Sequence, residues 1–105
     1  FESLTRGVEL VQQRLSSPLR VADLAEAAGC SEKQLERRMK KVFGLSATQY
    51  VLRVRVDRAT SLLLNSEEPI ASVAVSCGFY DQASFTRQFG RLAGETPARF
   101  RTLSA

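Results

Sequence analysis

The chain has 105 residues, of which 44% are hydrophobic and 25% are charged, a balance typical of a compact globular domain rather than a disordered segment. Arg53, Arg55 and Asp57 interrupt its longest apolar stretch, so no run approaches the roughly 20 apolar residues that a membrane span requires. Fifteen basic and eleven acidic residues give a net charge of +4 and a pI near 9.6, which favours anionic partners such as nucleic acid.

The absence of histidine limits the chemistry of the chain. No Ser-His-Asp or Cys-His arrangement can form and no Gly-rich phosphate loop appears, so we expect no enzyme and no catalytic residue. Cys30 and Cys77 lack the partners of a zinc site, and neither a metal nor a cofactor is expected. We expect both cysteines to be small buried apolar residues, with a disulfide as the alternative. Glu67 and Glu68 are expected in a solvated loop rather than as paired catalytic carboxylates.

The first two predicted helices lie close together in the chain. Apolar residues at helical spacing over residues 4–15 predict a first helix, which the Ser-Ser-Pro segment at 16–18 ends. A short helix over residues 21–28 is predicted to stop at Gly29, because glycine allows the sharp turn that follows.

A longer third helix follows this turn. Ser31 can cap its start and Gly44 ends it. Its predicted inward residues are Leu35, Met39 and Val42. Two helices joined by a short glycine turn, the second longer and more basic, are typical of a helix-turn-helix.

Residues 46–64 are locally ambiguous, because Leu52, Val54 and Val56 alternate with polar residues as in a half-buried strand. We predict a helix, since the segment runs nearly twenty residues without Gly or Pro and Ser46 can cap it. Its apolar helical face is expected to continue through Ala59 and Leu62 to Leu64.

The rest of the chain repeats the earlier plan. A short helix over residues 70–77 begins after Pro69 and turns at Gly78. Asp81 can cap a longer helix that Gly94 ends. The predicted inward residues of that helix are Phe85, Phe89 and Leu92. A last short helix includes Thr96, Pro97 and Phe100.

These elements predict an all-α fold of about seven helices, with two helix-turn-helix units joined by a long linker helix. The expected boundaries are residues 1–45 for the first unit, 46–65 for the linker helix and 66–105 for the second unit. Together they are expected to form one domain.

The two halves match residue by residue. The offset is 49 up to Gly78 and 50 after it, so one residue has been inserted just past this glycine. A match that resumes in phase beyond an insertion indicates a duplicated structural unit. The pairs at offset 49 are Val21/Ile70, Leu24/Val73, Ala25/Ala74 and Gly29/Gly78. The pairs at offset 50 are Leu35/Phe85, Arg37/Arg87, Met39/Phe89, Gly44/Gly94, Ser46/Thr96 and Tyr50/Phe100.

The inward residues identify the side chains that could contact DNA, because the second helix of a helix-turn-helix enters the major groove with its opposite face. The candidates for base contacts are Lys33, Glu36, Arg37 and Lys40 in the first unit and Gln82, Ala83, Thr86 and Arg87 in the second. The candidates for phosphate contacts are Arg38, Lys41 and Arg91.

A solvated helix face is the alternative for each of these residues, and it is favoured for Lys33, Glu36 and Lys40 taken singly. Both units keep an arginine two residues after an inward residue, which favours DNA contact for Arg37 and Arg87. Four phenylalanines of the second half could suggest a base-stacking platform, but their helical spacing favours core packing. These are Phe79, Phe85, Phe89 and Phe100.

The second-half run from Gly78 to Phe89 and the closing pair Phe100-Arg101 form a specific combination. With these residues the chain resembles the DNA-binding domain of the AraC/XylS bacterial transcription regulators over nearly its whole length. Other matching residues are Leu24, Ala25, Gly29, Ser31, Leu35, Arg37, Lys40, Lys41, Gly44, Tyr50, Arg55, Ala59, Gly94, Thr96 and Pro97. Arg38 and Met39 replace the usual pair of large apolar residues, so we expect looser packing there or an Arg38 turned toward phosphate.

The resemblance implies two helix-turn-helix units that place their recognition helices in successive major grooves on one face of a duplex. Grooves repeat about every 34 Å, and a helix over residues 47–64 would be roughly 27 Å long. The resemblance also implies RNA polymerase as a second partner and a location in the bacterial cytoplasm with the nucleoid. An effector-sensing or dimerising domain is expected before Phe1, so that an effector ligand would bind outside this segment.

The expected function is therefore sequence-specific binding of double-stranded DNA and regulation of transcription, with activation as the expected direction. The alternative is a helical protein-interaction module that does not bind DNA. Such a module would expose an apolar patch on a recognition helix. The outward candidates are polar and basic, which favours DNA.

Overall fold

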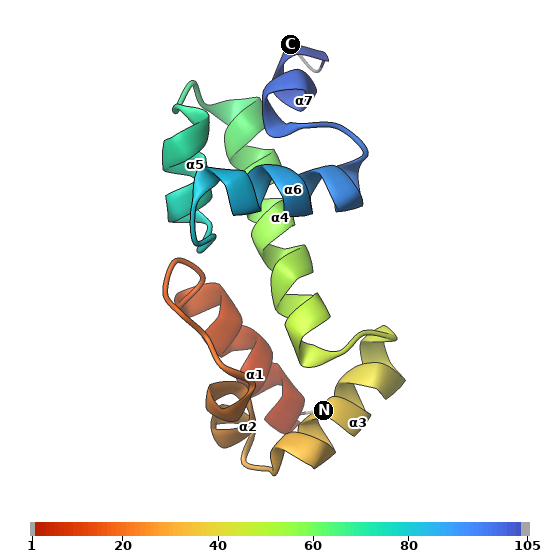
Figure 1. Ribbon diagram of the computed structural model, residues 1–105. Helices are drawn as coiled ribbons and strands as arrows, with labels where there is room; N and C mark the ends of the chain where they lie inside the picture. The colour runs from red at the N-terminus through yellow and green to blue at the C-terminus, as the bar shows by residue number, and fades with distance from the viewer. Residues whose placement is uncertain (1, 104–105) are drawn as a thin grey trace. The chain divides into compact units, whose positions relative to one another are not determined.

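The computed structural model describes residues 2–103, which form seven α helices and no strand (Figure 1). The helices are α1 (Glu2–Gln13), α2 (Val21–Ala28), α3 (Glu32–Phe43), α4 (Ala47–Asn65), α5 (Ile70–Ser76), α6 (Gln82–Ala93) and α7 (Pro97–Leu103). The all-α prediction is confirmed, including the helical interpretation of residues 46–64. None of the described helices is long and apolar enough to cross a membrane. The domain expected before Phe1 lies outside the described residues.

The chain divides into two compact units, Phe1–Val54 and Arg55–Ala105. The boundary falls inside α4, so each unit includes part of this helix. Both halves carry buried side chains, with Ala47 and Val51 in the first unit and Ala59 and Leu63 in the second. The helix interpreted as a linker thus also supplies core residues.

Each unit buries the inward face of the second helix of its helix-turn-helix, which is α3 in the first unit and α6 in the second. In the first unit Leu35 and Met39 of α3 are at most 3% exposed and belong to one core with α1, α2 and the start of α4. In the second unit Phe85 and Phe89 of α6 are fully buried. Because burying one such side chain contributes roughly 1.5–3 kcal/mol, these residues fix how each helix is turned about its axis.

The core of the second unit is a continuous series of aromatic rings. Phe79 contacts Phe85 at 4.8 Å between ring centroids, and Phe85 contacts Phe89 at 5.5 Å. Phe100 of α7 extends the series to Phe89, also at 5.5 Å. These distances suit edge-to-face and tilted ring pairs, which contribute beyond the area they bury. The phenylalanines therefore form a core and not a base-stacking platform, as the sequence predicted.

The first unit has smaller residues in the matching places. Leu35 and Met39 stand where α6 has two phenylalanines, and a hollow of about 10 Å³ remains beside them. Tyr50, the equivalent of Phe100, packs instead against Phe43 with ring centroids 4.7 Å apart.

Both cysteines are free thiols. Cys77 is fully buried, and burial raises the pKa of its thiol to about 11, so it stays protonated and acts as a small apolar residue. Cys30 is half-buried and packs against the core of the first unit.

The predicted caps are present at the start of both longer helices. The Ser31 hydroxyl accepts a hydrogen bond from the Gln34 amide at 3.1 Å, and the Asp81 carboxylate accepts one from the Ser84 amide at 2.7 Å. Glycines in the left-handed conformation, Gly44 and Gly94, end these helices. Ser46 also caps α4 through the Gln49 amide at 3.1 Å.

The two glycine turns are built alike and locate the inserted residue. In the first unit the backbone amide of Gly29 donates to the Glu26 carbonyl, and the amide of Cys30 donates to the Ala25 carbonyl. In the second unit the amide of Gly78 donates to the Val75 carbonyl, and the amide of Phe79 donates to the Ala74 carbonyl. All four hydrogen bonds are 3.0–3.1 Å long. This pairing is the Schellman motif, in which the residue after the glycine closes the turn. The N-cap of α3 follows directly after Cys30, whereas Tyr80 separates Phe79 from the N-cap of α6. Tyr80 is therefore the inserted residue.

Three apolar residues predicted to lie inward are exposed. Val42 is 43% exposed and its equivalent Leu92 is 37% exposed, and Leu64 of α4 is 50% exposed. All three lie in the last turn of a helix. At 1.5 Å per residue α3 is about 18 Å long and α2 only about 12 Å, and α6 is likewise longer than α5. The apolar period of α3 and α6 therefore continues past the length of the shorter helix before each of them, whereas nothing in the structure explains the exposure of Leu64.

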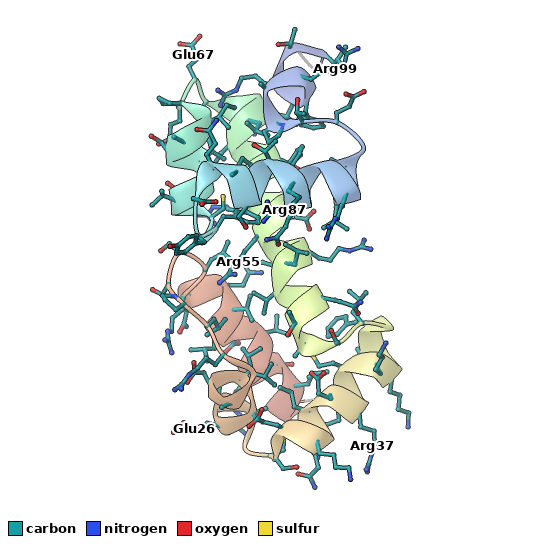
Figure 2. All side chains as sticks on the ribbon, viewed as in Figure 1. Glu26, Arg37, Arg55, Glu67, Arg87 and Arg99 are labelled. Carbon is teal, nitrogen blue, oxygen red and sulfur yellow. The ribbon has the colours of Figure 1, made fainter. Side chains whose placement is uncertain are left out.

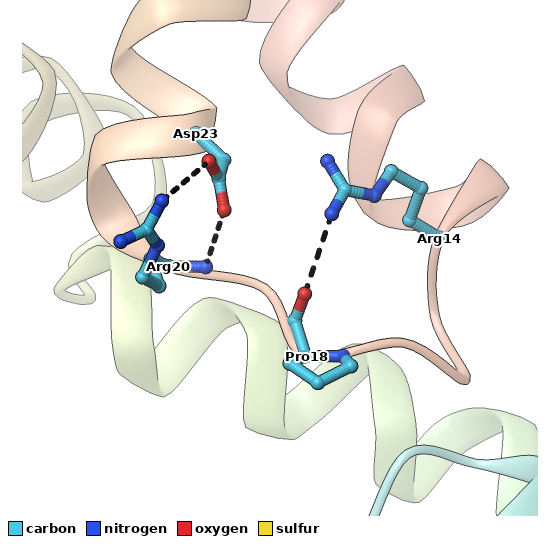
Figure 3. A network of polar contacts seen from close by, with 4 residues as sticks. All are labelled: Arg14, Pro18, Arg20 and Asp23. Atoms are coloured by element: carbon cyan, nitrogen blue, oxygen red, sulfur yellow. Dashed lines mark hydrogen bonds and ion pairs between the residues drawn. The ribbon is translucent and has the colours of Figure 1, made fainter.

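The loop between α1 and α2 is held by a small polar network (Figure 3). The Asp23 carboxylate accepts a hydrogen bond from the Arg20 amide at 3.0 Å and lies 3.7 Å from the Arg20 guanidinium. The hydrogen bond from this amide lowers the pKa of Asp23. Arg14 Nη2 donates to the Pro18 carbonyl at 3.4 Å. The contacts fix where α2 begins.

Arg101 holds three parts of the second unit together. From α7 its Nε donates to the Leu63 carbonyl in the last turn of α4 at 3.1 Å, and its Nη1 donates to the Glu68 carbonyl before α5 at 2.6 Å. Leu63 lies among the four final carbonyls of a helix that have no partner within it. A cation there also interacts favourably with the helix dipole.

Replacing Arg101 should therefore destabilise the second unit. We predict that Arg101→Met lowers the free energy of unfolding by about 2–3 kcal/mol, because two charge-assisted hydrogen bonds are lost. The matched control is Arg99→Met on the same helix, whose side chain is 66% exposed and forms an ion pair with Glu95. This control should change stability by about 0.5 kcal/mol or less. Equal losses for the two variants in urea unfolding would contradict the assignment.

Candidate nucleic-acid interface

The outward face of α3 is strongly basic. Five basic and two acidic side chains occupy Glu32–Phe43, while the charged residues of α2 are Asp23 and Glu26. Lys33, Arg37 and Lys40 are all exposed, and Arg37 extends from the helix into open space (Figure 2). These three predicted base-contact candidates lie at helical spacing, so they share one face. The phosphate candidates Arg38 and Lys41 are exposed beside them.

Glu36 differs from the other candidates on α3. Its carboxylate Oε1 accepts a hydrogen bond from the Ala47 amide at 2.8 Å, and its side chain is partly buried. Ala47 is the first residue of α4 and is fully buried. Glu36 therefore satisfies an unpaired amide at the start of α4, where a negative charge is favourable. No local sequence pattern could indicate this contact, because its partners are 11 residues apart and on different helices.

The outward face of α6 is also basic, but α6 carries fewer basic side chains than α3. Gln82, Ala83 and Arg87 are exposed and Thr86 is half-buried. The phosphate candidate Arg91 is exposed in the last turn. The helix contains no acidic residue, so its two arginines set its charge.

The equivalent positions of the two faces carry different side chains. Arg37 corresponds to Arg87 and Lys41 to Arg91, but Lys33 and Lys40 correspond to small residues. Those small residues are Ala83 and Gly90. A Cβ atom at Gly90 would meet nothing within 4 Å beyond the neighbouring backbone of its own helix, so a methyl group would fit there. Arg87 thus has small, uncharged residues on either side along its helix face, whereas Arg37 lies between two lysines.

The described residues hold no group of three or more cysteine and acidic side chains arranged to bind a metal ion. The exposed cationic faces of α3 and α6 are suited to phosphate oxygens and to the acceptor atoms of guanine. We therefore treat these two faces as a candidate nucleic-acid interface.

Comparison with known proteins supports this interpretation. Residues 24–102 match the model of a family described as a helix-turn-helix domain. The chain is 34% identical over 91 residues to the HTH-type transcriptional activator RhaR of Escherichia coli K12, covering 87% of this chain and 32% of that protein. The chain spans about a third of the length of the curated relatives it matches.

Solved structures agree in fold over nearly the whole chain. A transcriptional regulator with an AraC-type DNA-binding domain from Chromobacterium violaceum has a TM-score of 0.92 at 31% identity, covering 99% of this chain and 93% of that one. The DNA-binding domain of the global transcriptional factor AdpA, solved with a target DNA, has a TM-score of 0.91 at 29% identity, covering 96% and 91%.

The role of Glu36 can be tested without DNA. We predict that Glu36→Ala lowers the free energy of unfolding by about 1–2 kcal/mol, because the Ala47 amide loses its partner at a helix start. The matched control on the same helix is Lys40→Ala, an exposed residue whose change should fall within about 0.5 kcal/mol of zero. Thermal and urea unfolding measure both. If Glu36→Ala is as stable as Lys40→Ala, the carboxylate has no structural role.

Proposed function

Because the chain belongs to the AraC/XylS-type family of helix-turn-helix DNA-binding domains, we propose that it binds a specific sequence of double-stranded DNA through the outward faces of α3 and α6. The observation that carries this proposal is the pair of exposed basic faces, each opposite a core that fixes the rotation of its helix. The similar AdpA domain, solved with its target DNA, supports the same interpretation.

Base contacts are proposed for the outward residues of each helix. Arg37 and Arg87 are suited to the O6 and N7 acceptors of guanine. On α3, Lys33 and Lys40 offer further donors to the same acceptors. On α6, Gln82 is suited to adenine, while Ala83 and Thr86 can contact the methyl group of thymine. The two units are therefore expected to prefer different base sequences.

Glu36 remains a weaker proposal for base contact. The Ala47 amide holds the Glu36 carboxylate in place at the start of α4, so the orientation in which it could accept from the amino group of cytosine is restricted. Its proposed main role is to fix the position of α3 relative to the start of α4.

Phosphate contacts are proposed for Arg38, Lys41 and Arg91. These side chains lie on the flanks of the outward faces, where they would meet the backbone that borders a groove. Such contacts hold the protein in register but carry no sequence information. Lys41 and Arg91 are equivalent residues, so both units would bind the backbone in a similar way.

The wider role is proposed from the relatives. RhaR is a transcriptional activator, and we propose that this chain also serves activation of transcription in the bacterial cytoplasm, with RNA polymerase as a second partner. Since the relatives are about three times longer, an effector ligand is proposed to bind outside this segment. A protein-interaction module is not favoured, because the exposed large apolar residues of α3 and α6 lie in the last turns of these helices and not on their outward faces. They are Val42, Phe43 and Leu92.

Duplex binding at several salt concentrations tests the proposal. We expect binding at low salt and a steep loss of affinity as salt rises, since several phosphates are neutralised. Arg87→Ala should cost about 1–3 kcal/mol on the preferred sequence and little on a mixed-sequence duplex. Arg91→Ala is the matched control: it should weaken binding to both duplexes equally and reduce the salt slope by about one.

Two results would contradict the proposal. If the wild-type chain does not bind duplex DNA at low salt, the proposed function is wrong. If Arg87→Ala weakens both duplexes equally, Arg87 binds phosphate and does not contact a base.

A further inference from the structure

Tyr80 is a large side chain with no cover in the part of the chain that the structure describes. It is 93% exposed, the highest value among the large hydrophobic residues there. The first unit completes the same turn without any equivalent residue, so the turn itself does not require one. Leaving an aromatic ring in water gains nothing for folding, which makes Tyr80 a candidate for contact with a partner.

The residues on either side hold Tyr80 in one place. Phe79 is 7% exposed, packs on Phe85, and donates its amide to the Ala74 carbonyl at 3.0 Å. Asp81 is the N-cap of α6, fixed by its hydrogen bond to the Ser84 amide. Tyr80 is thus carried by an anchored backbone and lies directly before the N-cap of the recognition helix of the second unit.

This place is where the DNA backbone would run. The N-terminal residues of a recognition helix contact base edges in the major groove, so the residue just before the helix is close to the phosphates that border the groove. Tyrosine is among the side chains that donate hydrogen bonds to phosphate oxygens. Its ring has only two rotatable bonds, so ordering it on binding costs little entropy.

We propose that Tyr80 contacts the DNA backbone, its phenol hydroxyl donating to a phosphate oxygen beside the groove that α6 enters while its ring packs on the adjacent deoxyribose. This inference rests on the proposed function. It assigns the residue inserted into the second unit a contact that the first unit cannot make, because Ser31 follows Cys30 directly. Tyr80 would thereby strengthen the second half of the interface, where α6 has fewer basic residues than α3.

Two substitutions separate the hydroxyl from the ring. Tyr80→Phe removes only the hydrogen bond and Tyr80→Ala removes the ring as well; both should fold as the wild type, because the side chain is exposed. We expect Tyr80→Phe to bind about five- to tenfold more weakly, and Tyr80→Ala more weakly still. The control is Tyr50→Phe, a half-buried tyrosine against Phe43, which should bind as the wild type does.

Dissociation constants are measured on a mixed-sequence duplex and on a duplex enriched from random sequences by the wild-type chain. The loss for Tyr80→Phe should be equal on both duplexes, since a phosphate carries no sequence information. The slope of affinity against salt should stay unchanged, because tyrosine is neutral and releases no counterion. Single phosphates of the duplex can be replaced by neutral methylphosphonates. At one phosphate position this replacement should weaken binding of the wild type but leave the affinity of Tyr80→Phe unchanged.

The outcomes distinguish this inference from the function on which it rests. If the wild-type chain binds neither duplex, the proposed function is wrong. If the wild type binds and both Tyr80→Phe and Tyr80→Ala bind as tightly as the wild type does, only the role of Tyr80 is overturned. A loss confined to the enriched duplex would also overturn it, since Tyr80 would then contact a base.

Discussion

Burial of two side chains on each recognition helix determines which residues α3 and α6 present to a partner. Leu35 and Met39 on α3, and Phe85 and Phe89 on α6, are almost wholly removed from water. A rotation of either helix about its axis would expose these residues at a cost of several kcal/mol. The face opposite them is therefore fixed, and with it the positions of Arg37 and Arg87. The glycine turns and the caps add to this by determining where α3 and α6 begin and end.

The duplication has preserved this constraint while the surface has changed. The turn hydrogen bonds, the N-caps and the left-handed glycines recur in both units, and so do the exposed arginine and the basic residue four positions after it. Around them, two lysines of α3 are replaced by Ala83 and Gly90 in α6, and Tyr80 is added before α6. A common scaffold with different outward side chains is what two unlike half-sites in DNA would require.

Local sequence patterns predicted most of the fold and part of the candidate interface. Helix starts followed from Ser31 and Asp81, helix ends from Gly44 and Gly94, and the inward faces from apolar spacing. The prediction that Val42 and Leu92 lie inward is wrong, because the apolar spacing of one helix does not reveal how far the helix that packs against it extends. The Glu36–Ala47 contact joins two helices and has no local signal. The change of offset after Gly78 indicated an insertion, but only the turn hydrogen bonds assign it to Tyr80, and only the structure shows how exposed this side chain is.

Selection of binding sites from a pool of random duplexes tests the central claim most directly, namely that one repeated scaffold presents two different faces to DNA. We predict that the enriched sequences contain two unrelated half-sites at a constant spacing, and that Arg37→Ala and Arg87→Ala each relax only one of them. Enrichment of a palindrome, of two identical half-sites or of no preferred sequence would contradict this account.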